Sequence, residues 1–153
     1  MNDAEANKMS KHYSIGIDTG VHTGFAVWDG HTFVEIDTLP IHRAMERVRH
    51  YVEDAALDGS TVTVVFEDAR QRKWFPRMTA QKDRARLQGA GSVKRDATIW
   101  EDFCKDYGIA YEAKAPKNNI TKMNAQYFAR LTGWTHRCSE HARDAAMLVF
   151  ARK

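Results

Sequence analysis

Two short, strongly apolar segments that each lead into an acidic residue limit most tightly how this chain can fold. Residues Tyr13–Asp18 and Thr61–Phe66 are rich in aliphatic, β-branched and aromatic side chains, as strands that are buried on both faces of a sheet are. Asp18 ends the first segment and Glu67 follows the second. A strand that is buried on both faces needs a cover above and below its sheet. The two segments therefore predict central strands of an α/β sheet, each with a carboxylate at its end.

The rest of the chain supplies partners for these two strands. The Asp29-Gly30 pair is a hairpin signal between two further β-prone stretches. The expected additional strands are Phe25–Trp28, Thr32–Thr38 and Gly108–Ala113, and the expected helices are Ile41–Ala55, Ala97–Tyr107, Thr121–Leu131 and Glu140–Arg152. This order predicts an α/β fold with a mixed five-stranded sheet and helices on both faces. We expect one domain over residues 13–153, preceded by a flexible tail over residues 1–12.

Composition excludes several classes of protein. The chain has 153 residues, and no apolar run approaches the roughly 20 residues that cross a bilayer. Residues Met1–Lys11 are polar, with no apolar stretch behind them, so they do not resemble a signal peptide. Two cysteines, Cys104 and Cys138, are too few for a disulfide scaffold. We therefore expect a cytoplasmic protein with free thiols and without a membrane partner.

One stretch of the chain, which we call the basic window, covers residues 70–95. It has nine basic side chains against the single acid Asp83, a local charge of +8, whereas the whole chain has only +3. The basic residues are Arg70, Arg72, Lys73, Arg77, Lys82, Arg84, Arg86, Lys94 and Arg95. Such a patch on an otherwise acidic body predicts a polyanionic partner. The alternative is an ordinary solvated helix face.

Two adjacent aromatic residues inside the basic window strengthen the nucleic-acid interpretation. Trp74 and Phe75 precede Pro76 in a segment without hydrophobic periodicity. Aromatic rings within a positive surface are typical of proteins that stack on unpaired bases. A packed loop anchor remains the alternative for this pair.

Four residues from three distant segments are candidates for chemistry. His141 and Asp144 are three positions apart, so in a helix they share a face, and Ala145 and Ala146 next to them can pack closely on a sheet. Together with Asp18 and Glu67 they form a largely acidic set, which we call the four-residue cluster. Neighbouring carboxylates repel each other, and a cation between them relieves that repulsion.

Each member of the cluster also has a plainer interpretation. Asp18 could start a turn, Glu67 could be an acid at the edge of a strand, and His141 could be a surface or capping residue. Asp68 and Glu140 are adjacent acids that would replace Glu67 and Asp144 if the strand or helix were shifted by one residue.

A zinc site is a second interpretation for part of this region. His136, Cys138 and His141 are close in sequence. Their spacing matches no common four-ligand site, and a fourth ligand is missing. The sequence therefore does not favour zinc.

Three motifs resemble the acidic motifs of RuvC-type Holliday junction resolvases, in the same order and on matching elements. They are Ile15-Gly16-Ile17-Asp18-Thr19-Gly20, Val65-Phe66-Glu67 and His141-Ala142-Arg143-Asp144-Ala145-Ala146. Residues Leu87–Gly91 also resemble the glycine-containing start of that family's long central helix. The resemblance covers roughly Tyr13 to the C-terminus and implies an RNase H-like fold, which has the element order deduced above.

The resemblance also implies an activity and its cofactor. It implies two Mg²⁺ ions, or Mn²⁺ as a substitute, held by Asp18, Glu67, His141 and Asp144. Two such cations suit phosphodiester hydrolysis, because one activates water while the other neutralises the leaving oxygen. The implied enzyme is a magnesium-dependent endonuclease that resolves four-way junctions or other branched DNA, with no nucleotide cofactor.

The same resemblance suggests how the substrate is bound. An aromatic residue shortly after the second acid acts as a wedge in that family, and Trp74 or Phe75 has a similar place here. Lys117 and Lys122 fall near the family's phosphate-binding lysines. A homodimer is expected, because a four-way junction has approximate two-fold symmetry and is cut in two strands. Ile99, Trp100 and Phe103 would either pair across the dimer axis or lie in the monomer core.

Three rival functions follow from parts of the same sequence. Asp18-Thr19-Gly20 with Thr23-Gly24 resembles the first phosphate loop of actin-like ATPases and sugar kinases, but those proteins bind nucleotide between two such domains. A second rival is a DNA-binding module without turnover. The third is a flap, fork or general nuclease, because a fold does not determine its substrate.

Overall fold

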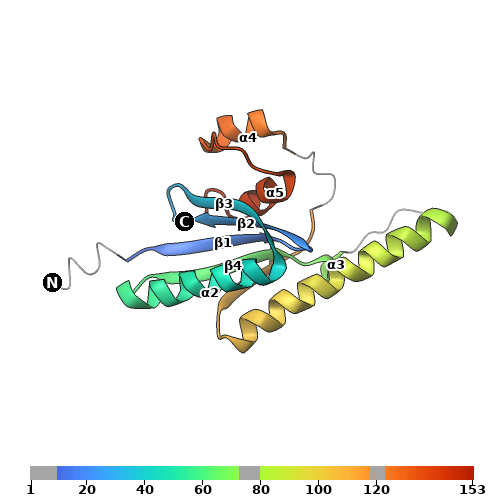
Figure 1. Cartoon of the computed structure of the whole chain (residues 1–153), viewed down its shortest axis with the longest axis horizontal. Helices are drawn as coiled ribbons and strands as arrows, with labels where there is room; N and C mark the ends of the chain where they lie inside the picture. The colour runs from blue at the N-terminus through green and yellow to red at the C-terminus, as the bar shows by residue number, and fades with distance from the viewer. Residues whose placement is uncertain (1–9, 73–79, 118–122) are drawn as a thin grey trace.

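The computed structural model describes residues 10–72, 80–117 and 123–153, and its centre is a five-stranded sheet (Figure 1). The strands are β1 (His12–Asp18), β2 (His22–Trp28), β3 (Phe33–Pro40), β4 (Thr61–Glu67) and β5 (Ala110–Lys114). They are arranged in the order β3-β2-β1-β4-β5. β1, β2 and β3 form an antiparallel meander, whereas β4 pairs parallel to β1 and β5 parallel to β4. The prediction of a mixed five-stranded α/β sheet is confirmed.

Helices cover both faces of the sheet, as expected (Figure 1). They are α2 (Ile41–Asp58), the short 3-10 turn η1 (Ala69–Gln71), α3 (Ala80–Asp106), α4 (Ala125–Thr132) and α5 (Glu140–Val149). α2 and α3 contribute to one hydrophobic cluster, and α4 and α5 contribute to the other. None of the helices in the described part of the chain is long and apolar enough to cross a membrane.

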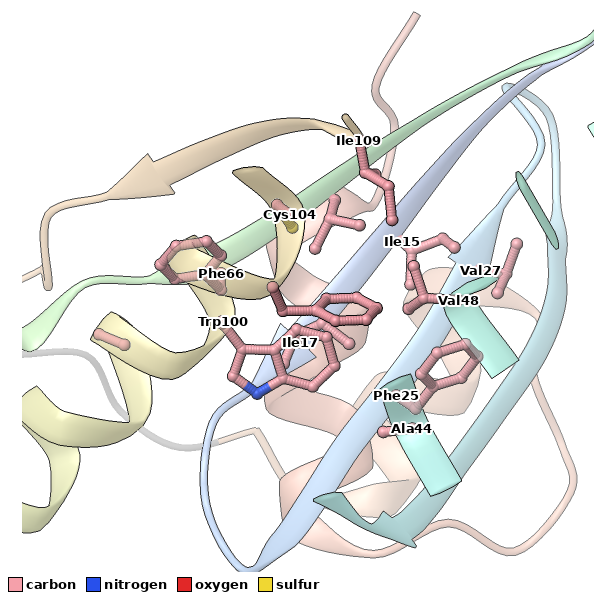
Figure 2. Close-up of a cluster of buried hydrophobic side chains, with 13 residues drawn as sticks. Ile15, Ile17, Phe25, Val27, Ala44, Val48, Phe66, Trp100, Cys104 and Ile109 are labelled. Carbon is pink, nitrogen blue, oxygen red and sulfur yellow. The ribbon is translucent and has the colours of Figure 1, made fainter. Parts of the chain in front are cut away.

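Trp100 of α3 belongs to the first cluster, which also contains Ile17, Phe25 and Val48 (Figure 2). Trp100 is fully buried and Phe103 is 9% exposed, while Ile99 is 40% exposed. The sequence left open whether these three residues pair across a dimer axis or lie in the monomer core. Trp100 and Phe103 lie in the core. Ile99 alone remains on the surface.

α3 differs most from the sequence-based expectation. It begins at Ala80, well before the predicted start at Ala97, so the second half of the basic window is helical. The early turns contain good helix formers such as alanine, glutamine, lysine and arginine. They extend beyond the sheet (Figure 1) and therefore need no apolar stripe, which is the signal that periodicity detects.

The last two helices also have different limits from those expected. α4 begins at Ala125 behind its cap Asn124, whose side chain accepts a hydrogen bond from the Tyr127 amide. Residues 121 and 122 of the predicted Thr121–Leu131 helix lie outside the described residues. α5 ends at Val149, not Arg152, and Ala151 has a φ of 61°, which is incompatible with a continued right-handed helix.

Candidate active site

The register of the two central strands brings Asp18 and Glu67 to the same edge of the sheet. Ile17 of β1 and Phe66 of β4 are direct neighbours in a parallel ladder. The next residue on each strand is the acid, so Asp18 and Glu67 leave the sheet side by side. This placement agrees with the expectation that carboxylates at the ends of neighbouring strands lie together.

α5 approaches the sheet closely because glycine takes the places where a side chain would collide with it. A Cβ atom on Gly24 of β2 would lie 2.0 Å from the carbonyl oxygen of His141, and one on Gly16 of β1 would lie 2.1 Å from that of Ala145. Real Cβ atoms do not approach so closely, so only glycine fits at both positions. The fully buried alanines 142, 145 and 146 form the helix side of this contact.

This close packing places His141 beside Asp18. The Nδ1 atom of His141 lies 2.9 Å from Oδ2 of Asp18, and both side chains are accessible from solvent. Ser139 begins α5 by accepting a hydrogen bond from the Ala142 amide, and its hydroxyl also contacts the hydroxyl of Thr38 on β3. The start of α5 is thus fastened to the sheet edge that holds Asp18.

Glu67 interacts electrostatically with both aspartates of the cluster. Although the Glu67 residue is exposed, protein atoms around its carboxyl group partly desolvate it, and this desolvation is the main cause that raises its pKa. Repulsion from Asp18 and Asp144 raises the pKa further, and Arg72 opposes the shift. Asp18, Glu67, His141 and Asp144 therefore converge at one edge of the sheet, where their negative charge is concentrated.

Asp68 and Glu140, the possible replacements for Glu67 and Asp144, have other surroundings. Asp68 is only 4% exposed, and its carboxylate accepts hydrogen bonds from Arg70 and Gln71. Hydrogen bonds from Arg70 are the main cause that holds the pKa of Asp68 below its usual value. Glu140 is exposed in the first turn of α5. Glu67, not Asp68, is thus the acid that interacts with Asp18 and Asp144.

The donor atoms of the cluster suit a hard divalent cation. Three carboxylates and one imidazole favour Mg²⁺ or Mn²⁺ over softer metals. Desolvation is the main cause that raises the pKa of Glu67, and repulsion from Asp18 and Asp144, which a cation would relieve, raises it further. Across residues 10–72, 80–117 and 123–153, no three His, Cys, Asp or Glu side chains are already arranged to hold an ion. His136, Cys138 and His141 are among the described residues and do not form such a group.

The basic residues predicted to bind DNA are in three different situations. Arg72 at the end of η1, Lys94 and Arg95 on α3, and Lys117 after β5 are exposed. Lys82, Arg84 and Arg86 belong to the early turns of α3. Lys73, Trp74, Phe75, Arg77 and Lys122 lie outside the described residues.

Arg70 is a residue of the basic window that has carboxylate partners within the protein. Its guanidinium donates hydrogen bonds to Asp68 and to Glu101 of α3. Sequence reasoning missed Glu101 as a partner, because nothing in the linear pattern connects α3 to the end of β4. It also missed the role of Gly16 and Gly24, although glycine inside a strand often marks a close backbone approach.

Comparison with known proteins gives no independent assignment. No family model, curated protein or solved structure matches this chain. The function is therefore argued from the four-residue cluster and the charged surface next to it.

Proposed function

We propose that this chain is a metal-dependent DNA endonuclease with an RNase H-like fold, and that branched DNA such as a four-way junction is its substrate. The observation that carries the proposal is the convergence of the four-residue cluster from the ends of β1 and β4 and the start of α5. The His141 to Asp18 contact and the repulsion of Glu67 by Asp18 and Asp144 define that convergence. The element order and the mixed sheet also support an RNase H-like fold.

The cluster supplies what phosphodiester hydrolysis requires. When bound, two divalent cations would activate a water molecule and neutralise the leaving oxygen. Asp18 lies next to both His141 and Glu67 and would therefore be shared between the two ion positions. Glu67 would hold one side, and His141 with Asp144 the other. The carboxylates also repel DNA when no cation is present, so other residues must hold the phosphates.

The exposed basic residues would bind the DNA phosphates. Arg72 is close enough to the cluster to affect the Glu67 carboxyl group, and Lys94 and Arg95 continue the positive surface along α3. Lys117 follows β5, whose end lies beside β4. Contacts of this kind position the phosphates without reading the base sequence. We retain Trp74 and Phe75 as the proposed wedge at a junction.

A homodimer would give a symmetric junction two active sites. α3 presents Val93 and Ile99, which are 41% and 40% exposed, on a helix whose early turns project from the body (Figure 1). Exposed apolar side chains on a projecting helix suit a second copy of the chain.

The decisive experiment is a cleavage panel. Four-way junction, fork, flap, single strand and duplex are compared at equal concentration with Mg²⁺, with Mn²⁺ and with EDTA. We expect nicking of branched substrates with either metal ion and none with EDTA. Asp18→Asn should abolish cleavage while junction binding persists. Asp54→Asn, which changes an exposed acid on α2, is the matched control and should cut normally.

The other outcomes distinguish the rivals. Cleavage that survives EDTA would contradict the metal mechanism. Equal cutting of all five substrates would indicate a general nuclease, and junction binding without cutting would indicate a DNA-binding module. Nucleotide binding detected by calorimetry would favour the kinase-like alternative.

A further inference from the structure

The turn that follows Glu67 is held by a network of charged side chains that joins it to α3. Asp68 caps η1 by accepting a hydrogen bond from the Arg70 amide at 3.0 Å. Its two carboxylate oxygens also accept from the Arg70 guanidinium, Oδ1 from Nε at 2.8 Å and Oδ2 from Nη2 at 3.0 Å. This is a two-point contact, which fixes the orientation of both partners as well as their distance.

Arg70 continues the network to α3. Its Nη2 atom donates to Oε2 of Glu101 at 3.1 Å, and Nη1 lies 3.4 Å from Oε1 of the same residue. Nη1 also donates to the hydroxyl of Thr98 at 3.3 Å. One guanidinium therefore joins the end of β4 to the C-terminal third of α3. We call Asp68, Arg70 and Glu101 the η1 clamp.

The opposite side of the same turn is fastened to β5. The amide of Asp68 donates to the carbonyl of Lys114 at 2.7 Å, and the side chain of Gln71 donates to the carbonyl of Ala113 at 3.1 Å. The backbone that leaves Glu67 is thus held by α3 on one side and by β5 on the other.

We propose that Arg70 is a positioning residue, which fixes Glu67 within the four-residue cluster through the η1 clamp, and that it is not a phosphate ligand. This inference rests on the proposed nuclease function. Asp68 directly follows Glu67, so any movement of Asp68 moves the backbone of Glu67. Arg70 is already bonded to two carboxylates, and binding phosphate would require it to leave a nearly buried partner.

Arg72 provides the contrast within the same turn. It is two positions from Arg70, at the end of η1, and both residues are exposed, but the guanidinium of Arg70 is hydrogen-bonded to Asp68 and Glu101. Charge alone does not distinguish the two arginines of the basic window, whereas their contacts in the structure differ. Arg70 should therefore affect the chemical step, and Arg72 should affect DNA affinity.

The test compares Arg70→Met with Arg72→Met, which remove the same group from the two positions. Steady-state cleavage of a junction gives kcat and KM, and DNA binding is measured as a function of salt. For Arg70→Met we expect kcat to fall roughly 10- to 100-fold, as is typical when the support of a metal ligand is lost. Its DNA affinity and salt dependence should remain those of the wild type. For Arg72→Met the salt slope should fall in magnitude by about one.

Two further variants cover the case in which Arg70→Met does not fold. Arg70→Lys keeps the charge but not the two-point geometry, so it should not restore kcat. Glu101→Gln should lower kcat in the same direction without changing DNA affinity. Calorimetry with Mn²⁺ alone, without DNA, should show weaker binding for all three clamp variants than for the wild type.

The outcomes separate this inference from the proposed function. A wild-type protein that neither cuts DNA nor binds Mn²⁺ would overturn the proposed function, and the role of Arg70 with it. If the wild type is active but Arg70→Met loses salt slope and affinity at unchanged kcat, then Arg70 is a phosphate ligand and only this inference is wrong. Full activity of Arg70→Lys would likewise contradict the need for the clamp geometry.

Discussion

The imidazole Nδ1 of His141 lies 2.9 Å from Oδ2 of Asp18, although the two residues are 123 positions apart in the chain. This contact exists because α5 lies directly on β1 and β2, where Gly16 and Gly24 leave room for its backbone. The chemistry proposed for the cluster thus depends on two residues that have no side chain. Several measurements test this dependence and its consequences.

Metal binding should be detectable without any DNA. A cation that binds only the folded protein stabilises it by about 2.7 kcal/mol at a concentration 100 times its Kd. For a chain of this length such a gain should raise the Tm by roughly 5 to 10 °C. We expect Mn²⁺ to raise the Tm of the wild type and of Asp54→Asn, but not that of Asp18→Asn. An equal shift in all three proteins, measured by calorimetry, would place the ion elsewhere.

Gly24→Ala should damage both stability and activity. The new methyl group would lie 2.0 Å from the His141 carbonyl oxygen and 2.9 Å from Cβ of Asp18, so α5 must move away from β2. Overpacking of this kind typically costs about 1 to 3 kcal/mol, and the movement should separate His141 from Asp18. Chemical denaturation and junction cleavage measure the two effects.

Gly91→Ala is the matched control for that change. A Cβ atom there meets no described atom within 4 Å, and alanine is favoured over glycine inside a helix by about 0.5 to 1 kcal/mol. The control should therefore be as stable as the wild type or more so. If Gly24→Ala proved as harmless as Gly91→Ala, the close packing of α5 on β2 would be refuted.

Glu67→Gln should stabilise the protein at neutral pH while it removes activity. The folded state raises the pKa of Glu67 above its usual value of 4.5, so folded protein binds that proton more tightly than the unfolded chain. The stability contributed by this group is therefore present at pH below 4.5 and is lost as the pH rises through the raised pKa. Glutamine stays neutral and avoids the loss.

Melting curves without metal, at pH 4 and pH 7, measure this effect. The variant should melt above the wild type at pH 7, and the difference should be lost at pH 4. Saturating Mn²⁺ should reverse the order at pH 7, because only the wild type gains the ion. A variant that is less stable than the wild type at pH 7 without metal would show that folding does not raise the pKa of Glu67.

The sequence predicts the sheet and the cluster for a clear physical reason. Val64, Val65 and Phe66 are all fully buried, and strands that are buried on both faces leave an apolar run that can be recognised without a structure. His141 and Asp144 are found from helical spacing, since residues three positions apart share one face of a helix. Short-range patterns therefore identify the residues, and strand register brings them together.

The limits of sequence reasoning are equally specific. The start of α3 has no apolar stripe in its sequence, so hydrophobic periodicity gives no signal there. Periodicity therefore places the start of the helix at Ala97 instead of Ala80. Arg70 belongs to the most basic part of the chain, yet its partners Asp68 and Glu101 are determined by how α3 crosses the end of β4. Contacts between distant segments of this kind leave no signal in composition.

The last prediction concerns the proposed dimer. Ile99 is 40% exposed on α3, so a charge at this position should not unfold the monomer, but it should oppose pairing of two α3 helices across an apolar contact. Ile99→Glu should therefore be monomeric by light scattering, whereas we expect the wild type to be dimeric. Val34→Glu, which alters an exposed apolar residue on the outer strand β3, is the control and should remain dimeric.

The same variants should differ in how they cut a cruciform plasmid. A dimer presents two active sites to one junction, so the wild type and Val34→Glu should cleave both strands within one binding event and give linear product. Ile99→Glu should mainly give nicked circles, because each monomer carries a single four-residue cluster. Linear product formed at the wild-type rate by a monomeric Ile99→Glu protein would show that paired α3 helices are not needed, and the dimer would then have to form through another surface.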